Sequence, residues 1–192
     1  MNFIAKIISG LSSPFVVICG FALWVIYYYS ATITQFIYFS LPFFVLIIVL
    51  PLIWIYIGVR KGKFTDIHVA IKEQRSEPFI VATVGAILLT LIYITINTPR
   101  ALIALSVNLV VSGLIFGILS KIWKVSIHAA SFTASVIIVA LLINLHFIWL
   151  LIGLPIIIWA RIKRKRHNVS QSLIAAIIIA VTTIIICLLI LK

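Results

Sequence analysis

Residues 168–191 read NVSQSLIAAIIIAVTTIIICLLIL, a stretch of 24 residues without a charged side chain. About 20 apolar residues of α-helix cross the hydrocarbon core of a bilayer, so this stretch is long enough to span a membrane. Six earlier runs share its apolar character: residues 14–31, 37–59, 78–96, 101–120, 126–143 and 146–160. The pattern predicts an all-α protein, a polytopic transmembrane helical bundle of about six to seven spans.

The composition supports the same class. Of the 192 residues, 65% are hydrophobic and 9% are charged, which excludes a soluble globular domain. The runs are continuously apolar, whereas the strands of a membrane β-barrel alternate. Residues 126–160 are too many for one helical crossing at about 1.5 Å per residue, so two helices with a turn at residues 144–146 are expected. No internal repeat is present, and residues 1–192 are predicted to form a single domain.

The basic residues set the predicted orientation. The formal charge of +12 is spread over short clusters between apolar runs, a pattern typical of membrane topology signals rather than of nucleic-acid binding. With seven spans, 13 of the 15 Lys and Arg residues fall on one side, which the positive-inside rule places in the cytoplasm. The other side receives Arg100 and Lys192.

Two segments are expected at the membrane surface. Residues 1–13 form a short interfacial segment that ends at Pro14. The polar loop 60–77 is predicted to be cytoplasmic and contains all three acidic residues of the chain. Within it Phe64, Ile67 and Ile71 share one helical face, which predicts an amphipathic surface helix, capped by Thr65.

Polar residues gather at three places on the predicted cytoplasmic side. An even number of spans separates these places, so the side chains are expected to meet at one depth in the bundle. They are Lys72 with Arg75, Ser126 with His128, and Arg161 with His167 and Gln171.

These residue types suit phosphoryl transfer. Cations hold the phosphate oxygens, while a nucleophile and a general acid act on the two sides of the phosphorus. The guanidinium of Arg161 matches phosphate geometry, and His167 is expected at the start of the last helix, where N–H groups favour an anion. Gln171 lies four residues later, and its oxygen is expected to accept the imidazole N–H.

The spacings Ser126-x-His128 and Arg161-x5-His167-x3-Gln171 resemble the motifs of the type 2 phosphatidic acid phosphatase superfamily of integral membrane lipid-phosphate phosphatases. The resemblance implies that His167 is a nucleophile that forms a phosphohistidine and that His128 is the general acid. It also implies that Arg161 and Ser126 bind phosphate and that neither a metal nor another cofactor is required.

The chain departs from the superfamily's pattern at several positions. Gln171 stands where most members have Asp, a change that looks similar to some polyisoprenyl diphosphate phosphatases. Ala160 replaces Ser in the third motif, and the second motif lacks its Pro and Gly. Lys72 and Arg75 are assigned as phosphate-binding residues in place of the first motif, whose strict spacing is not present.

Three functions remain open at this point. The first is a lipid-phosphate phosphatase acting on a polyprenyl diphosphate or monophosphate, or on phosphatidic acid. The second is a non-catalytic relative that binds or moves phospholipids or serves as a membrane subunit. The third, a Mg²⁺-dependent transferase, needs several carboxylates around a diphosphate, and Asp66, Glu73 and Glu77 all lie in one loop.

Overall fold

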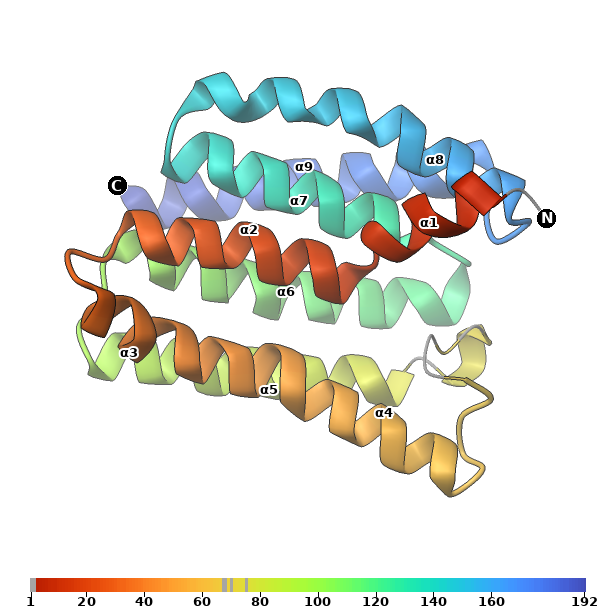
Figure 1. Ribbon diagram of the computed structural model, residues 1–192, viewed down its shortest axis with the longest axis horizontal. Coiled ribbons are helices and arrows are strands. Elements are labelled where there is room, and N and C mark those ends of the chain that lie inside the picture. Colours follow the sequence, from red (N-terminus) through yellow and green to blue (C-terminus); the bar gives the residue numbers. More distant parts are fainter. Residues whose placement is uncertain (1–2, 67–68, 70, 75) are drawn as a thin grey trace. The chain divides into compact units, whose positions relative to one another are not determined.

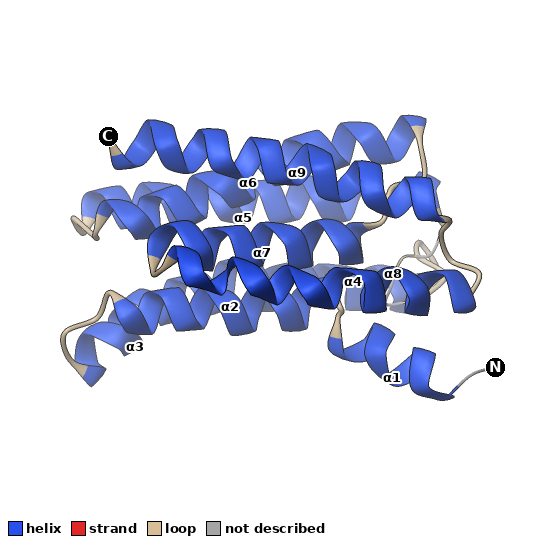
Figure 2. Cartoon of the chain, turned by 90° about the horizontal axis from the view of Figure 1, so that it is seen from above, coloured by secondary structure: helices blue, strands red, loops and turns tan. Residues whose placement is uncertain are grey.

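The computed structural model describes residues 3–66, 69, 71–74 and 76–192, and its secondary structure over these residues is helical (Figures 1 and 2). The elements are α1 (Phe3–Leu11), α2 (Pro14–Tyr28), α3 (Ile33–Phe43), the π-helix η1 (Phe44–Val49), α4 (Leu50–Arg60), the 3₁₀-helix η2 (Lys72–Gln74), α5 (Ser76–Thr95), α6 (Arg100–Ile122), α7 (Ile127–Leu142), the 3₁₀-helix η3 (Leu145–Gly153), α8 (Leu154–Lys163) and α9 (Val169–Leu191).

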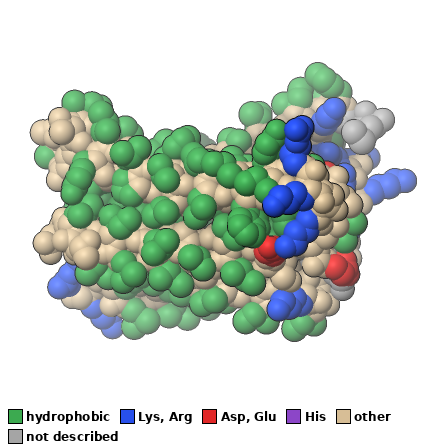
Figure 3. Space-filling view, turned by 90° about the horizontal axis from the view of Figure 1, so that it is seen from below, with side chains coloured by type: hydrophobic (Ala, Val, Ile, Leu, Met, Phe, Trp, Pro, Cys, Tyr) green, Lys and Arg blue, Asp and Glu red, His purple; other side chains and the backbone are tan. Residues whose placement is uncertain are grey.

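The predicted class, an all-α bundle of the membrane type, is confirmed. Five helical segments of the described chain are long and apolar enough to cross a bilayer, and the pair α1–α2, bent by 45°, is a sixth candidate. The remaining predicted run, residues 126–143, forms α7, which has only 16 residues. Hydrophobic side chains cover most of the face seen in Figure 3. The protein is therefore a membrane protein.

The expected turn between two helices in residues 126–160 is also confirmed. Asn144 caps η3, and its side-chain oxygen accepts the His146 N–H at 2.8 Å. The 3₁₀-helix rises about 2.0 Å per residue, against about 1.5 Å in an α-helix. With 9 residues in η3 and 10 in α8, this segment reaches roughly 33 Å, enough to cross a core of about 30 Å.

The chain divides into two compact units. Unit 1 comprises Met1–Tyr28 and Val125–Lys192, and unit 2 comprises Tyr29–Lys124. In unit 1, α7 contacts α2, α8, α9 and η3, while α1 packs against α8. The buried side of α7 is rich in Ala, Ser and Thr, small residues that allow close approach between membrane helices.

In unit 2, a long helix formed by α3, η1 and α4 packs against α5, and α5 packs against α6. The π-helical turn lies between Pro42 and Pro51. Proline removes one backbone donor and crowds the carbonyl four residues earlier, and a π-bulge is one known response of a helix. The Leu50 N–H accordingly bonds the carbonyl of Val45, five residues back.

The predicted amphipathic α-helix in the loop 60–77 is wrong over the residues described. Between α4 and α5 the described residues form turns and bends, and among them only the three residues of η2 are helical. Phe64 is buried against Gly58 instead of lying on a surface helix. Thr65 caps no helix, because its N–H and hydroxyl both point to the Gln74 side-chain oxygen, at 3.1 and 3.2 Å. Ile67 lies outside the described residues.

Candidate active site

Five of the predicted site residues lie at one end of unit 1. Ser126 precedes α7, His128 is in the first turn of α7, and Arg161 is in the last turn of α8. His167 lies between α8 and α9, and Gln171 is in the first turn of α9. The Ser126 N–H donates to the Gln171 carbonyl at 3.2 Å, so the starts of α7 and α9 are adjacent.

The reversal between α8 and α9 places His167. Lys165 adopts the left-handed conformation with φ 53°, and its N–H bonds the Ile162 carbonyl at 2.8 Å. The Arg166 N–H bonds the Arg161 carbonyl at 3.1 Å. These two bonds form a Schellman motif, which ends α8 and turns the chain back. His167 follows directly and is buried, with 9% of its surface exposed.

A capping box starts α9. The Asn168 side chain accepts the Gln171 N–H at 2.8 Å, and the Gln171 side-chain oxygen accepts the Asn168 N–H at 3.2 Å. This arrangement corrects two expectations. The Gln171 side-chain oxygen, expected to bind the imidazole, accepts the Asn168 backbone N–H instead. The backbone N–H groups at the start of α9 were expected to face an anion, but those of Asn168 and Gln171 take part in the capping box.

Arg161 is buried and bound to the N-terminal helix. It is 8% exposed, and its Nη1 donates to the Ser9 hydroxyl at 2.7 Å. Nη1 of Arg164 donates to the same hydroxyl at 2.9 Å. Two guanidinium groups thus converge on one neutral oxygen. Like charges this close repel each other, and a bound anion would relieve the repulsion.

Sequence reasoning missed Ser9. Residues 1–13 were expected to be only an interfacial segment, yet Ala5 and Ser9 form the buried stripe of α1 that faces α8. The available signal was the pair of small residues four apart in a mostly apolar helix, since small residues mark close helix contacts in membranes.

Ser126 contributes a buried hydroxyl. It is 0% exposed and holds the N-cap position of α7, but its side chain makes no capping bond. Within the described part of the chain, its Oγ has no hydrogen-bond partner. Serine at this position normally caps the helix, and a buried hydroxyl without a partner costs about 1–3 kcal/mol. A phosphate oxygen would be a suitable acceptor.

His128 is half-buried in the first turn of α7, and its carbonyl accepts a hydrogen bond from the Ser131 hydroxyl at 3.2 Å. Lys72 belongs to η2 in unit 2, and Arg75 lies outside the described residues. The assignment of Lys72 and Arg75 to the phosphate site therefore stays a prediction.

The charge of unit 1 favours an anionic ligand. This unit contains seven Lys and Arg residues, and the sequence places no Asp or Glu in it. Five of the bases are the cluster from Arg161 to Arg166 beside the candidate site. A concentration of one charge sign raises the local concentration of oppositely charged ligands.

No protein-family model, no curated protein and no solved structure matches this chain. The resemblance to the type 2 phosphatidic acid phosphatases therefore rests on the motif residues alone and stays a prediction.

Proposed function

We propose that the protein is an integral membrane phosphatase that removes phosphate from a lipid without a metal ion. The observation that carries the proposal is that the buried side chains of Arg161 and His167 lie at the same end of unit 1 as the buried Ser126 hydroxyl. Arg161 holds the phosphate oxygens, with Ser126 donating a hydrogen bond to one of them. The lipid tail stays in the bilayer, and the phosphate enters the basic end of the helices.

The reaction proceeds in two steps. An imidazole nitrogen of His167 attacks phosphorus, the bond to the lipid oxygen breaks, and His128 gives its proton to that oxygen. Water then attacks the phosphohistidine, and His128 takes a proton from the water. Inorganic phosphate leaves, and both histidines return to their starting states. The substrate is a polyprenyl diphosphate or monophosphate, or phosphatidic acid, and Gln171 favours the isoprenoid lipids.

The second candidate function is a non-catalytic phospholipid-binding protein. The capping box favours it, because the Gln171 oxygen is bound to the Asn168 N–H and the position carries no carboxylate to stabilise a charged imidazole. In this alternative the converging guanidinium groups bind a lipid phosphate without cleaving it.

Phosphate release distinguishes the two functions. The purified protein is given C55 isoprenyl diphosphate, the monophosphate and phosphatidic acid in detergent with EDTA. Release by the wild-type protein should fall at least a thousandfold in His167→Ala, since a nucleophile is lost. The control is His146→Ala, which changes an exposed histidine of η3. Release that survives His167→Ala, or that EDTA abolishes, contradicts the proposal. Binding without release supports the second candidate.

A further inference from the structure

One side chain of the basic cluster at the end of α8 is not an ordinary surface charge. Lys163, Lys165 and Arg166 are exposed, whereas Arg164 is half-buried. A cluster that only sets membrane topology needs no buried member, and basic side chains near a membrane surface usually keep their charged ends in water. The burial of Arg164 therefore indicates a second role.

Arg164 is held beside Arg161 by the N-terminal helix. The two residues are three positions apart at the end of α8, so their side chains leave the same face. α1 packs against α8 (Figure 1), and the Ser9 hydroxyl accepts from Nη1 of both arginines, at 2.7 and 2.9 Å. The two Nη1 atoms can be no farther apart than these two distances added together, so the guanidinium groups are neighbours.

The guanidinium of Arg164 has a second donor that the protein leaves unused. Nη1 is bonded to Ser9, while Nε is buried and, among the residues described, has no hydrogen-bond partner. The N–H groups of a guanidinium form a rigid fork that matches the oxygens of a phosphate. A buried donor without an acceptor costs free energy, and a phosphate oxygen at Nε would remove that cost.

The number of positive charges favours a diphosphate over a monophosphate. In the proposed mechanism Arg161 and the protonated His128 face a phosphate monoester, which carries about −1.5 to −2 charges at neutral pH. Arg164 adds one more positive charge, and the sequence places no acid in unit 1 to neutralise it. The two phosphates of a diphosphate share a bridging oxygen, so they match two neighbouring guanidinium groups.

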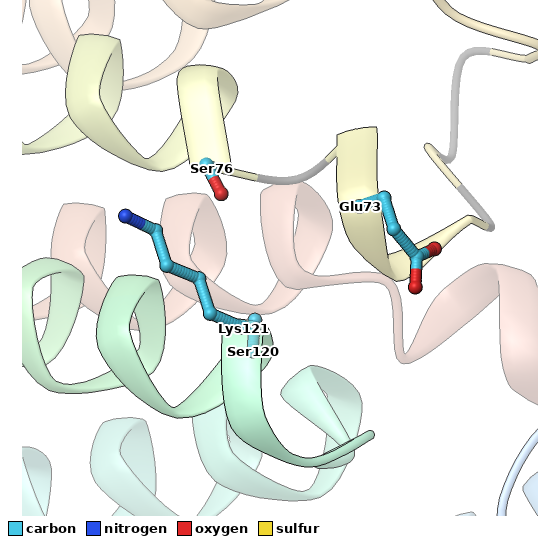
Figure 4. Close-up of a pocket in the computed structure, with 4 residues that line it drawn as sticks. All are labelled: Glu73, Ser76, Ser120 and Lys121. Carbon is cyan, nitrogen blue, oxygen red and sulfur yellow. The ribbon is translucent and has the colours of Figure 1, made fainter.

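The pocket of unit 2 offers no such pair. It has a volume of about 260 Å³ and is lined, within the part of the chain described, by Glu73, Ser76, Ser120 and Lys121. Figure 4 shows that its two charged side chains, Glu73 and Lys121, have opposite signs. The diphosphate assignment is therefore made to unit 1.

We propose that Arg164 binds the phosphate next to the lipid tail of a lipid diphosphate, while Arg161 holds the terminal phosphate that reacts. This inference rests on the proposed phosphatase and narrows its substrate. His167 attacks the terminal phosphorus, the bond to the bridging oxygen breaks, and His128 protonates that oxygen. Water then releases inorganic phosphate from His167 and returns a proton to His128. The other product is the lipid monophosphate, and Arg164 is a specificity-determining residue.

The test compares C55 isoprenyl diphosphate with the C55 monophosphate in detergent with EDTA. The wild-type kcat/KM should favour the diphosphate by roughly tenfold or more. Arg164→Gln should lower kcat/KM for the diphosphate about tenfold to a hundredfold, as expected for a lost hydrogen bond to a charged group, and for the monophosphate less than about threefold. Arg164→Lys keeps the charge without the fork, so it should restore only part of the loss.

Arg166→Gln is the matched control. It removes the same charge from the same cluster, but the Arg166 side chain is exposed. It contributes only long-range attraction, so kcat/KM should fall less than about threefold and equally for both lipids. If Arg164→Gln behaves like Arg166→Gln, or lowers kcat/KM for both lipids equally, Arg164 does not select the diphosphate and the inference is wrong.

A binding experiment separates this inference from the proposed function. Inorganic diphosphate and inorganic phosphate are titrated by calorimetry into His167→Ala, with and without Arg164→Gln. His167→Ala alone should bind the diphosphate roughly tenfold tighter, and the double variant should lose the preference. This result without phosphate release by the wild-type protein would contradict the phosphatase and keep Arg164 as a diphosphate-binding residue. Release that needs His167, without a diphosphate preference in either assay, would overturn the inference and leave the phosphatase standing.

Discussion

A single residue of the N-terminal helix α1, Ser9, connects this helix to the candidate active site. Its hydroxyl accepts hydrogen bonds from Arg161 and Arg164, so it fixes where two positive charges lie. A hydrogen bond to a charged group contributes about 1.5–3 kcal/mol, and every 1.4 kcal/mol is a factor of ten in affinity. Ser9 is therefore a positioning residue in the proposed phosphatase.

We expect Ser9→Ala to raise KM for the lipid phosphate on the order of tenfold while changing kcat less. Without the hydroxyl, the two guanidinium groups separate and hold the phosphate less well. Steady-state phosphate release gives both constants. Ser12→Ala is the matched control, since Ser12 is also buried near the end of α1 but bonds neither arginine in the part of the chain described. An equal rise in KM for both variants would show a general loosening of α1.

The roles of individual residues were the least predictable feature of the sequence. The pairing of Arg161 with Ser9 spans 152 positions, and no local pattern encodes such a contact. The capping box was readable, because Asn168 followed three residues later by Gln171 is a helix-start signature. The four-residue spacing between His167 and Gln171 predicted a bond to the imidazole instead, because residues four apart share one face of a helix.

The helices themselves were predictable from apolar length alone. Each predicted run lies on a helix, because a chain in a bilayer has to satisfy its backbone hydrogen bonds within the segment. The loop after α4 was not predictable in this way. There the spacing of Phe64, Ile67 and Ile71 predicted a helix. Instead, the Phe64 ring packs against Gly58, and the Gln74 side-chain oxygen accepts hydrogen bonds from Thr65.

The end of α8 carries a prediction about stability. Lys165 occupies the left-handed position of a Schellman motif, which usually holds glycine, and this conformation costs a non-glycine residue roughly 1–2 kcal/mol. Lys165→Gly should stabilise the protein by up to about 1 kcal/mol, after the entropy cost of glycine is subtracted. The melting temperature should rise by about 2–4 °C per kcal/mol for a chain of this size.

Lys163→Gly is the opposite control. Lys163 is the last residue of α8, and glycine in a helix costs about 1 kcal/mol, so the melting temperature should fall. Both variants remove one lysine from the same basic cluster, which holds the charge change constant. If both variants lower the melting temperature, the left-handed position is not a source of strain.

At the scale of the whole molecule, the open question is which side of the membrane the basic ends face. In unit 2, the loop after Arg60 and the segment at Lys121 lie at the same helix ends, and Arg100 begins α6 at the other end. In unit 1, the basic cluster that begins at Arg161 lies before the start of α9, and Lys192 lies at the opposite end of this helix. The positive-inside rule predicts that these basic ends face the cytoplasm, and the proposed phosphatase site is expected on that side as well.

Labelling with a membrane-impermeant maleimide tests this orientation in intact cells. Cys19 and Cys187 are first replaced by Ala, because both lie in apolar helices and would otherwise give background. Thr95→Cys, at an exposed position near the turn to α6, should react in intact cells. Lys61→Cys, exposed after α4, should react only after the membrane is permeabilised. The reverse pattern would put the basic ends outside, so a phosphatase site there would meet lipids of the outer leaflet.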